Sequence, residues 1–106
     1  MFDYFYGAQA EQFSFYRVPK VLFTKDQFKY LSAEAKTLYG IMLDKLDLSI
    51  KNNWVDEKGR VYIIYTIEQI MEDLNCGNKK AGQLLQDLEE KVGLIERKRQ
   101  GLCKIL

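Results

Sequence analysis

Apolar residues recur at helical spacing between residues 33 and 92, and this pattern predicts three helices. The first follows Ser32, a typical capping residue, and is expected to end near Leu46, before a polar, turn-rich segment over residues 47–60. Its apolar face occupies positions i, i+3, i+4, i+7 and i+11, which are Ala35, Leu38, Tyr39, Met42 and Leu46.

A strand and a short helix are predicted next. The run VYIIY at residues 61–65 has the β-branched and aromatic residues of a strand. Thr66 and Gln69 have the spacing of a capping box, so a helix is expected to begin there. The sequence NCG at residues 75–77 then predicts a tight turn, in which Gly77 takes the left-handed conformation and Asn78 caps the following helix.

The third helix has two distinct faces. Its apolar side consists of Ala81, Leu84, Leu85, Leu88 and Val92. At 100° per residue, the opposite side carries Lys79, Gln83, Gln86 and Glu90. Beyond Gly93, the segments LIERKRQ and LCKIL around Gly101 predict a β-hairpin with a basic tip.

Helix, strand, helix, tight turn, helix and hairpin, in this order, predict an α+β winged helix-turn-helix. Three main helices would be combined with a small antiparallel sheet, in which the C-terminal hairpin pairs with the strand after the first helix and forms the wing. We assign this domain to residues 32–106.

An aromatic arm is predicted over residues 1–31. Pro19 disfavours a continuous helix here, so we expect an extended segment that reaches Phe23, followed by a short helical turn opened by Thr24. Aromatic side chains this numerous either pack on the domain or form a contact between two copies of the chain. The candidates for self-association are Phe2, Tyr4, Phe5, Tyr6, Phe13 and Phe15.

Composition narrows the possible chemistry. The chain has 106 residues, enough for one small domain, and contains no histidine, the commonest general base and metal ligand. Cys76 and Cys103 form no C-x-x-C pair and are expected to be free thiols of a cytoplasmic protein. Neither a signal peptide nor a membrane span is predicted. Because the chain has no histidine and no cysteine pair, we expect no enzymatic activity, no metal and no cofactor.

Charge is distributed unevenly along a chain whose net charge is only +1. Residues 1–74 contain 9 basic and 11 acidic side chains, whereas residues 75–106 contain 7 basic and 4 acidic ones. The basic surplus thus falls on the predicted third helix and hairpin, where a polyanion would bind.

A polar helix face is more often solvated surface than a binding surface, but its place in a helix-turn-helix changes this expectation. The second helix of that motif enters the major groove, where Gln can bind adenine and Lys can bind guanine or phosphate. The candidate DNA-binding residues on this helix are Asn78, Lys79, Lys80, Gln83 and Gln86.

The hairpin supplies a second set of candidates, which are Arg97, Lys98, Arg99, Gln100 and Lys104. Basic residues beside a turn glycine can contact the phosphates of a DNA backbone, although they can also keep an exposed edge strand soluble. Strand alternation places Arg97 and Arg99 on one face and Lys98 on the other, so only part of the trio could touch DNA at once.

Several runs of the sequence resemble the N-terminal domain of the plasmid replication initiator protein A family, known from Gram-positive bacteria and their mobile elements. They are FYRVPKVLF, LSAEAKTLYGIMLDKLDLSIKNNWVDEKGRVYIIYT, IMEDLNCG and GLIERKRQG, and together they extend from about Phe13 to Gly101. In the family, the segment after the wing glycine continues through a Lys-Pro pair. Here Lys104 matches but the proline is missing.

The resemblance implies a winged helix that binds repeated sites in double-stranded DNA at a replication origin, without catalysis and as a homodimer. It also implies that contacts with host replication proteins belong to a separate C-terminal domain, for which 106 residues leave no room. Two alternatives stay open: a protein-interaction module of the same fold, assembled through the aromatic arm, and a winged-helix transcription regulator.

Overall fold

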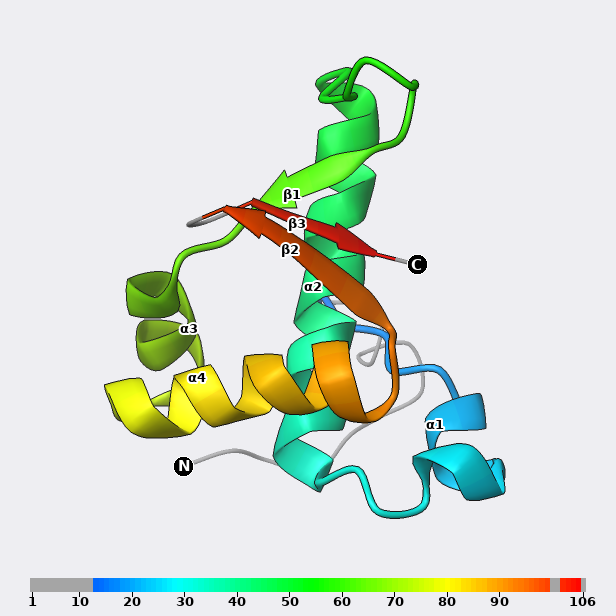
Figure 1. Ribbon diagram of the computed structural model, residues 1–106, viewed down its shortest axis with the longest axis vertical. Coiled ribbons are helices and arrows are strands. Elements are labelled where there is room, and N and C mark those ends of the chain that lie inside the picture. The colour runs from blue at the N-terminus through cyan, green and yellow to red at the C-terminus, as the bar shows by residue number, and fades with distance from the viewer. Residues whose placement is uncertain (1–12, 100–101, 106) are drawn as a thin grey trace.

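The computed structural model describes residues 13–99 and 102–105, which form an α+β domain (Figure 1). The helical elements include one 3-10 turn, η2, and one π-helical turn, η3, which directly continues α4. In chain order the elements are α1 (Val21–Thr24), η2 (Asp26–Phe28), α2 (Ala33–Lys51), β1 (Tyr62–Ile64), α3 (Ile67–Leu74), α4 (Asn78–Gln86), η3 (Asp87–Lys91), β2 (Ile95–Arg99) and β3 (Leu102–Ile105).

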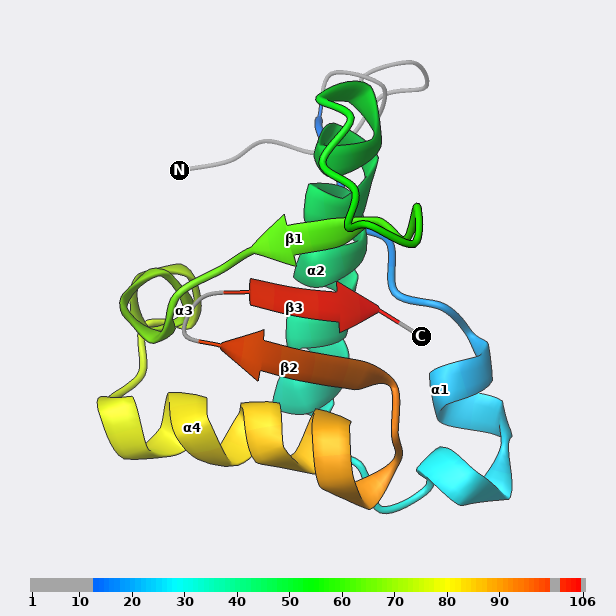
Figure 2. The same cartoon turned by 45° about the horizontal axis from the view of Figure 1, so that its top comes forward.

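Helix α2 runs through the centre of the domain and contacts β1, β3, α4 and η3. The sheet lies across one side of α2, with α3 near one end of the strands and α1 near the other (Figures 1 and 2). The strand order is β1-β3-β2, and both pairs are antiparallel. The predicted pairing of the hairpin with the strand that follows the first long helix is therefore confirmed.

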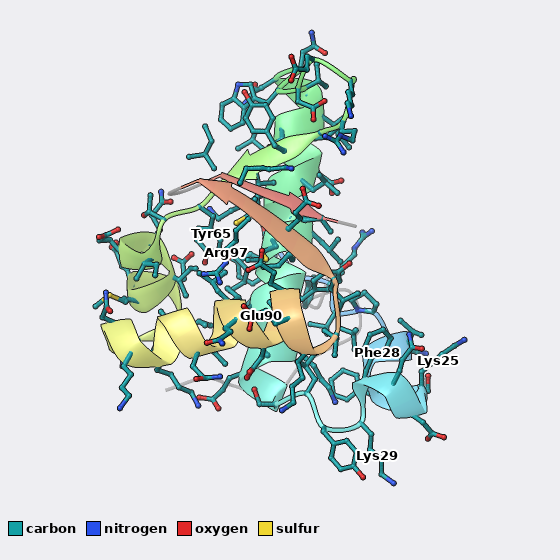
Figure 3. The ribbon with its side chains drawn as sticks, in the orientation of Figure 1. Lys25, Phe28, Lys29, Tyr65, Glu90 and Arg97 are labelled. Carbon is teal, nitrogen blue, oxygen red and sulfur yellow. The ribbon has the colours of Figure 1, made fainter. Side chains whose placement is uncertain are left out.

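One core joins these elements. The predicted apolar faces of α2, α3 and α4 are buried at their central positions, including Leu38, Ile70 and Leu84. The N-terminal segment also contributes Leu22 and Phe28 to this core. Phe28 points inward from η2, whereas Lys25 and Lys29 point away from the domain (Figure 3).

Helix α2 begins as predicted but extends further than predicted. The side chain of Ser32 accepts a hydrogen bond from the Ala35 N–H at 3.1 Å, which confirms the cap. The prediction that residues 47–51 are turn-like is wrong, because they complete the helix and Ser49 is buried within it. No glycine or proline interrupts the chain there, and the helix ends only at Lys51, with Asn52 as its C-cap, before Asn53 takes a positive φ of 58°.

The turn between α3 and α4 differs in detail from the prediction. The Thr66–Gln69 capping box is present. The left-handed residue, however, is Asn75 with φ 52°, whereas Gly77, with φ −83°, is the N-cap of α4, and Asn78 is the first helical residue. Asparagine tolerates the left-handed region, so α3 ends two residues earlier than a glycine-based rule suggests.

The arm also departs from the prediction. Val21 to Phe23 are helical rather than extended, and Thr24 ends α1 instead of opening a helical turn. Proline fixes a φ suited to the first turn of a helix, and the Leu22 N–H donates to the Pro19 carbonyl at 3.2 Å. Pro19 therefore lies just before a short helix, in a segment where we expected extended chain.

Residues before α1 pass close to α2 at Gly40. A Cβ atom at Gly40 would lie 2.9 Å from Val18 Cγ2 and 3.1 Å from the Arg17 carbonyl oxygen. Glycine is therefore required at this point of α2 for the two segments to approach each other.

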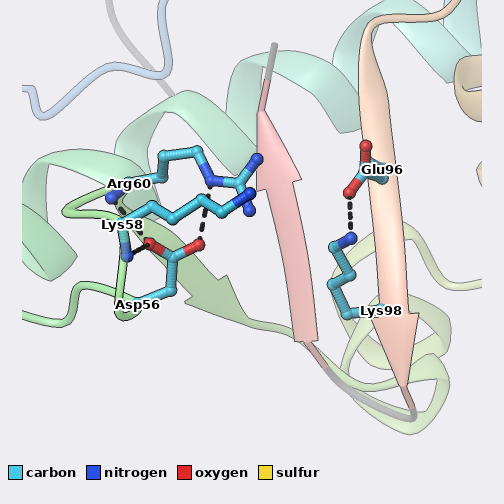
Figure 4. A network of polar contacts seen from close by, with 5 residues as sticks. All are labelled: Asp56, Lys58, Arg60, Glu96 and Lys98. Atoms are coloured by element: carbon cyan, nitrogen blue, oxygen red, sulfur yellow. Dashed lines mark hydrogen bonds and ion pairs between the residues drawn. The ribbon is translucent and has the colours of Figure 1, made fainter.

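A tight turn precedes β1 (Figure 4). Asp56 Oδ1 accepts from the backbone N–H groups of Lys58 and Arg60 at 2.9 and 2.8 Å, and Asp56 Oδ2 accepts from Arg60 Nε at 2.9 Å. Gly59 takes a positive φ of 78° within this turn. The carboxylate of Asp56 thus shapes the turn that leads into the sheet.

Candidate nucleic-acid interface

Helix α4 presents its predicted polar face to solvent. Its apolar residues Ala81, Leu84 and Leu85 are buried against the core. The five candidates predicted on this helix all lie on the exposed side, and they are Asn78, Lys79, Lys80, Gln83 and Gln86. The structure therefore brings them together on one surface, while their contact with DNA stays a prediction.

The first turn of α4 is the basic part of this surface. Lys80 Nζ lies 3.2 Å from Glu34 Oε1 at the start of α2, so its charge is partly balanced. Lys79 is exposed and forms no ion pair within residues 13–99 and 102–105. Gly77 provides no side-chain cap, which leaves the first N–H groups of the helix available to a ligand.

The middle of the face has an open position. Among residues 13–99 and 102–105, a Cβ atom added at Gly82 would meet no atom within 4 Å, apart from its chain neighbours and the helix backbone around it. Internal packing therefore does not explain a glycine at this helical position, where alanine would be the better helix former.

Both candidate glutamines are held by carboxylates one turn further along. Gln83 Nε2 donates to Asp87 Oδ1 at 2.9 Å, and Gln86 Nε2 donates to Glu90 Oε2 at 2.9 Å. Both acceptors lie in η3, the π-helical turn that follows α4. The sequence analysis missed this role of the two carboxylates, although the i, i+4 spacing of each pair is visible in the sequence.

Arg97 is bound to the same turn. Glu89 Oε2 accepts the Arg97 backbone N–H at 2.9 Å, and Glu89 Oε1 accepts Arg97 Nε at 2.8 Å. These backbone and side-chain hydrogen bonds lower the pKa of the Glu89 carboxyl group. Arg97 lies beside the last turns of the α4–η3 helix (Figure 3), and no sequence spacing signals this contact between a helix and an edge strand.

Part of the predicted arrangement of the hairpin is confirmed, because Arg97 and Lys98 lie on opposite faces of β2. Arg97 is paired with Cys103, which is buried, so Arg97 belongs to the core-facing side of β2. The pairing register with β3 shifts between Arg97 and Arg99, so β2 is irregular near its end. Backbone positions are described for Arg99 in β2 and Lys104 in β3, whereas Gln100 lies outside the described residues.

Lys98 lies on the outer side of β2. Its Nζ is 2.6 Å from Glu96 Oε1 on the same strand (Figure 4). About half of the Lys98 side chain is exposed, and such a pair at the surface contributes little to stability. Lys98 can therefore exchange Glu96 for another anion more easily than Arg97 can leave Glu89.

A buried tyrosine ties α3 to the sheet. The Tyr65 hydroxyl donates to Asp73 Oδ2 at 2.6 Å, and Lys45 Nζ lies 4.5 Å from the centre of the Tyr65 ring. Burial, followed by the hydrogen bond to Asp73, raises the pKa of Tyr65. The phenol thus stays protonated and remains a donor that fixes the first helix of the α3–α4 pair.

The predicted self-association residues are described only in part. Phe13 and Phe15 are exposed, with ring centroids 6.4 Å apart. The other four candidates, Phe2, Tyr4, Phe5 and Tyr6, lie outside the described residues. Three further aromatic side chains close to this segment in sequence are exposed as well, namely Tyr16, Phe23 and Tyr30.

Other chemistry receives no support from the described part of the chain. No group of three or more His, Cys, Asp or Glu side chains there is arranged to hold a metal ion. Both cysteines are free thiols, and burial raises the pKa of Cys103. Among residues 13–99 and 102–105, no helix has the length and apolar character needed to span a bilayer.

Comparison with known proteins places this domain among the replication initiators. Residues 14–105 match the family described as Replication initiator protein A (RepA) N-terminus. The chain therefore belongs to the RepA N-terminal family. It is also 31% identical over 87 residues to a Lactobacillus helveticus protein named "41 kDa protein", a match that covers 82% of this chain and 24% of that protein. The chain thus spans about a quarter of the length of this curated relative.

Solved structures agree with this assignment. One described as "Structure of MDR initiator" is 43% identical, with a TM-score of 0.80, and the match covers 98% of this chain and 85% of that one. Another, described as "Structure of Rep-DNA complex", is 38% identical, with a TM-score of 0.77, and the match covers 98% of this chain and 83% of that one. The domain is thus similar in sequence and fold to replication initiator domains.

Proposed function

We propose that the domain binds double-stranded DNA sequence-specifically, at repeated sites of a plasmid or mobile-element replication origin, and without catalysis. In this proposal it acts as a winged helix-turn-helix. Helices α3 and α4 form the helix-turn-helix, α4 enters the major groove, and the β2–β3 hairpin is the wing.

The exposed face of α4 carries the proposal. Five polar side chains and an open glycine position occupy the side of this helix that faces away from the core. Lysine and glutamine are side chains that can contact phosphates and base edges, and glycine lets the helix backbone approach closely. The similarity to the protein solved in the "Structure of Rep-DNA complex" supports this use of the face.

The distribution of charge along the α4–η3 helix favours its N-terminal half as the part that contacts DNA. Lys79 and Lys80 lie in the first turn, whereas Asp87, Glu89 and Glu90 lie in η3. Phosphates are attracted to the first group and repelled by the second. A recognition helix commonly contacts bases through its N-terminal residues, and this polarity agrees with that orientation.

The hairpin is assigned a supporting role. Arg97 forms an ion pair with Glu89, so in this proposal its main role is to hold the hairpin against η3. Lys98 is exposed on the outer side, and its exchangeable pair with Glu96 makes it the described wing residue best placed for a phosphate.

We extend the proposal to self-association through the N-terminal aromatic residues. Phe15 is 65% exposed and Tyr16 is 58% exposed, although both precede a segment that packs on the core. Exposed aromatic clusters of this kind often mark interfaces, and a dimer would bind paired repeats more tightly than a monomer.

The same exposed aromatics favour a second candidate, a protein-interaction module with little affinity for DNA. Salt dependence separates the two functions. Log affinity for DNA falls linearly with log salt, at a slope of about −0.9 per phosphate contact. A slope near zero would favour the interaction module.

The direct test is selection of binding sites by the unmodified chain from a random duplex library. The proposal predicts enrichment of one motif, and predicts that this motif recurs in the origin of the element that encodes the chain. Enrichment of a motif absent from that origin would retain DNA binding and reject the origin assignment. Failure to enrich any motif would reject sequence-specific binding.

A further inference from the structure

Three carboxylates in η3 each hold a residue that was predicted to contact DNA. Asp87 accepts from Gln83 and Glu90 accepts from Gln86, in both cases through the glutamine Nε2. Glu89 accepts two hydrogen bonds from Arg97. The five residues of η3 therefore contact two side chains on the exposed face of α4 and one residue of the hairpin.

The pairs define which way each glutamine amide is turned. An ionised carboxylate only accepts hydrogen bonds, so the group facing it must be the amide nitrogen and not the amide oxygen. One N–H of each amide is then occupied, while the carbonyl oxygen and the second N–H remain available. Adenine offers N7 as an acceptor and its N6 amino group as a donor in the major groove, which matches this remaining pair.

Helix stability alone is a weak explanation for these contacts. Glutamine–carboxylate pairs at i, i+4 on an exposed helix face stabilise the helix only slightly. Gln83 and Gln86 are exposed, and a free glutamine side chain would sample many rotamers that must be restricted on binding. Fixing the amide beforehand removes part of this entropic penalty.

We propose that Asp87 and Glu90 are positioning residues for base recognition, which orient the amides of Gln83 and Gln86 toward adenine in the major groove. The inference rests on the proposed DNA-binding function. Asp87 and Glu90 themselves make no base contact in this proposal. They act through the glutamines, and their negative charge weakens sequence-independent attraction to phosphates.

The test compares base-preference profiles, measured by titrating the selected site and its single-base variants. Gln83→Ala should relax discrimination at one base pair by about tenfold. Asp87→Ala should relax discrimination at the same base pair by about two- to tenfold, because Gln83 is present but no longer oriented. Asp87→Asn retains an amide oxygen that can accept the same N–H, and should restore the preference.

Charge is controlled within this set of variants. Asp87→Ala and Asp87→Asn both remove one negative charge, so both should raise affinity for all sequences to a similar extent, and only the first should alter base preference. Glu90→Ala and Glu90→Gln form the equivalent pair for Gln86. Asp47→Ala, which removes an exposed carboxylate from α2, should leave the preference unchanged.

A double-mutant cycle makes the result decisive. Once Gln83 is replaced by alanine, Asp87→Ala should cause no further loss of discrimination, because the two residues act as one unit. An Asp87→Ala profile identical to that of the unmodified chain, or additive losses in the double variant, would overturn the inference and leave DNA binding intact. Absence of any base preference in the unmodified chain would reject the proposed function and the inference together.

Discussion

Glu89 holds Arg97 by two hydrogen bonds, one to its backbone N–H at 2.9 Å and one to its Nε at 2.8 Å. The first residue lies in the π-helical turn after α4, and the second lies in the edge strand β2. Because one partner group is the backbone itself, the contact fixes the path of the strand as well as one side chain. It is a direct polar link between the proposed recognition helix and the proposed wing.

This link should be sensitive to acid. Its hydrogen bonds lower the pKa of Glu89 below the ordinary value of 4.5, so its contribution to stability is fully present above that value and is lost as the pH falls through the lower folded-state pKa. Glu89→Gln should reduce the free energy of unfolding by roughly 0.2 to 1 kcal/mol at neutral pH, since both side chains are partly exposed.

Urea unfolding of the unmodified protein and of the Glu89→Gln variant, near neutral pH and at about pH 3, checks this expectation. The difference between the two chains should shrink on acidification. In the Glu89→Gln background, Arg97→Ala should add little, because its partner charge is already removed. A difference that stays constant with pH would show that the ion pair does not contribute.

Tyr65 should be important for the stability of α3. Its hydroxyl donates to the Asp73 carboxylate at 2.6 Å, and the ring is almost fully buried. Tyr65→Phe should cost about 1 to 2 kcal/mol, near the lower end for a bond to a charged group, because Asp73 is exposed to water. Thermal unfolding should show the melting temperature falling by several degrees. An unchanged melting temperature would mean that solvent replaces this bond without loss.

Two helical glycines provide a matched pair. Alanine is the better helix former by about 0.5 to 1 kcal/mol. Gly82→Ala should therefore stabilise the domain by that amount, because its new methyl group would clash with nothing in the described part of the chain. Gly40→Ala should instead destabilise it, because the methyl group would press on Val18 and on the Arg17 carbonyl. Equal effects of the two substitutions in chemical unfolding would contradict the packing of residues 17 and 18 on α2.

The aromatic segment makes a prediction about assembly. Phe13 and Phe15 are more than half exposed, so replacing both by serine should disturb the core little. If these rings lie in a subunit interface, the unmodified chain should sediment as a dimer at high concentration and the double variant as a monomer. A monomeric unmodified chain would exclude this interface. Deleting residues 1–23 would be a poorer test, because Leu22 is part of the core.

The helix faces could be predicted from the sequence because burying a stripe of apolar residues is a local, periodic property. The Thr66–Gln69 capping box is equally local, and it is present. The ends of helices and the turns between them were harder to predict. Asn75 takes the left-handed conformation that a glycine-centred rule assigns to Gly77. Helix α1 begins two residues after Pro19, where the usual role of proline as a helix breaker suggested extended chain.

Contacts between distant segments could not be predicted. Glu89 and Arg97 meet only because β2 folds back beside η3, and nothing in their spacing indicates this. The bulge between Arg97 and Arg99 likewise depends on how β2 pairs with β3. The sequence therefore identified the polar face of α4 correctly but not the carboxylates that hold its glutamines.

The central claim is that α4 lies in the major groove, and methylation interference tests it most directly. Dimethyl sulfate methylates guanine at N7, in the major groove, and adenine at N3, in the minor groove. Duplexes carrying the selected site would be partly methylated, then separated into bound and free fractions by the unmodified chain. The account predicts that methylation at guanine N7 within the site blocks binding, whereas methylation at adenine N3 beside those guanines is tolerated. Interference confined to adenine N3, or absent throughout the site, would contradict the placement of α4 in the major groove.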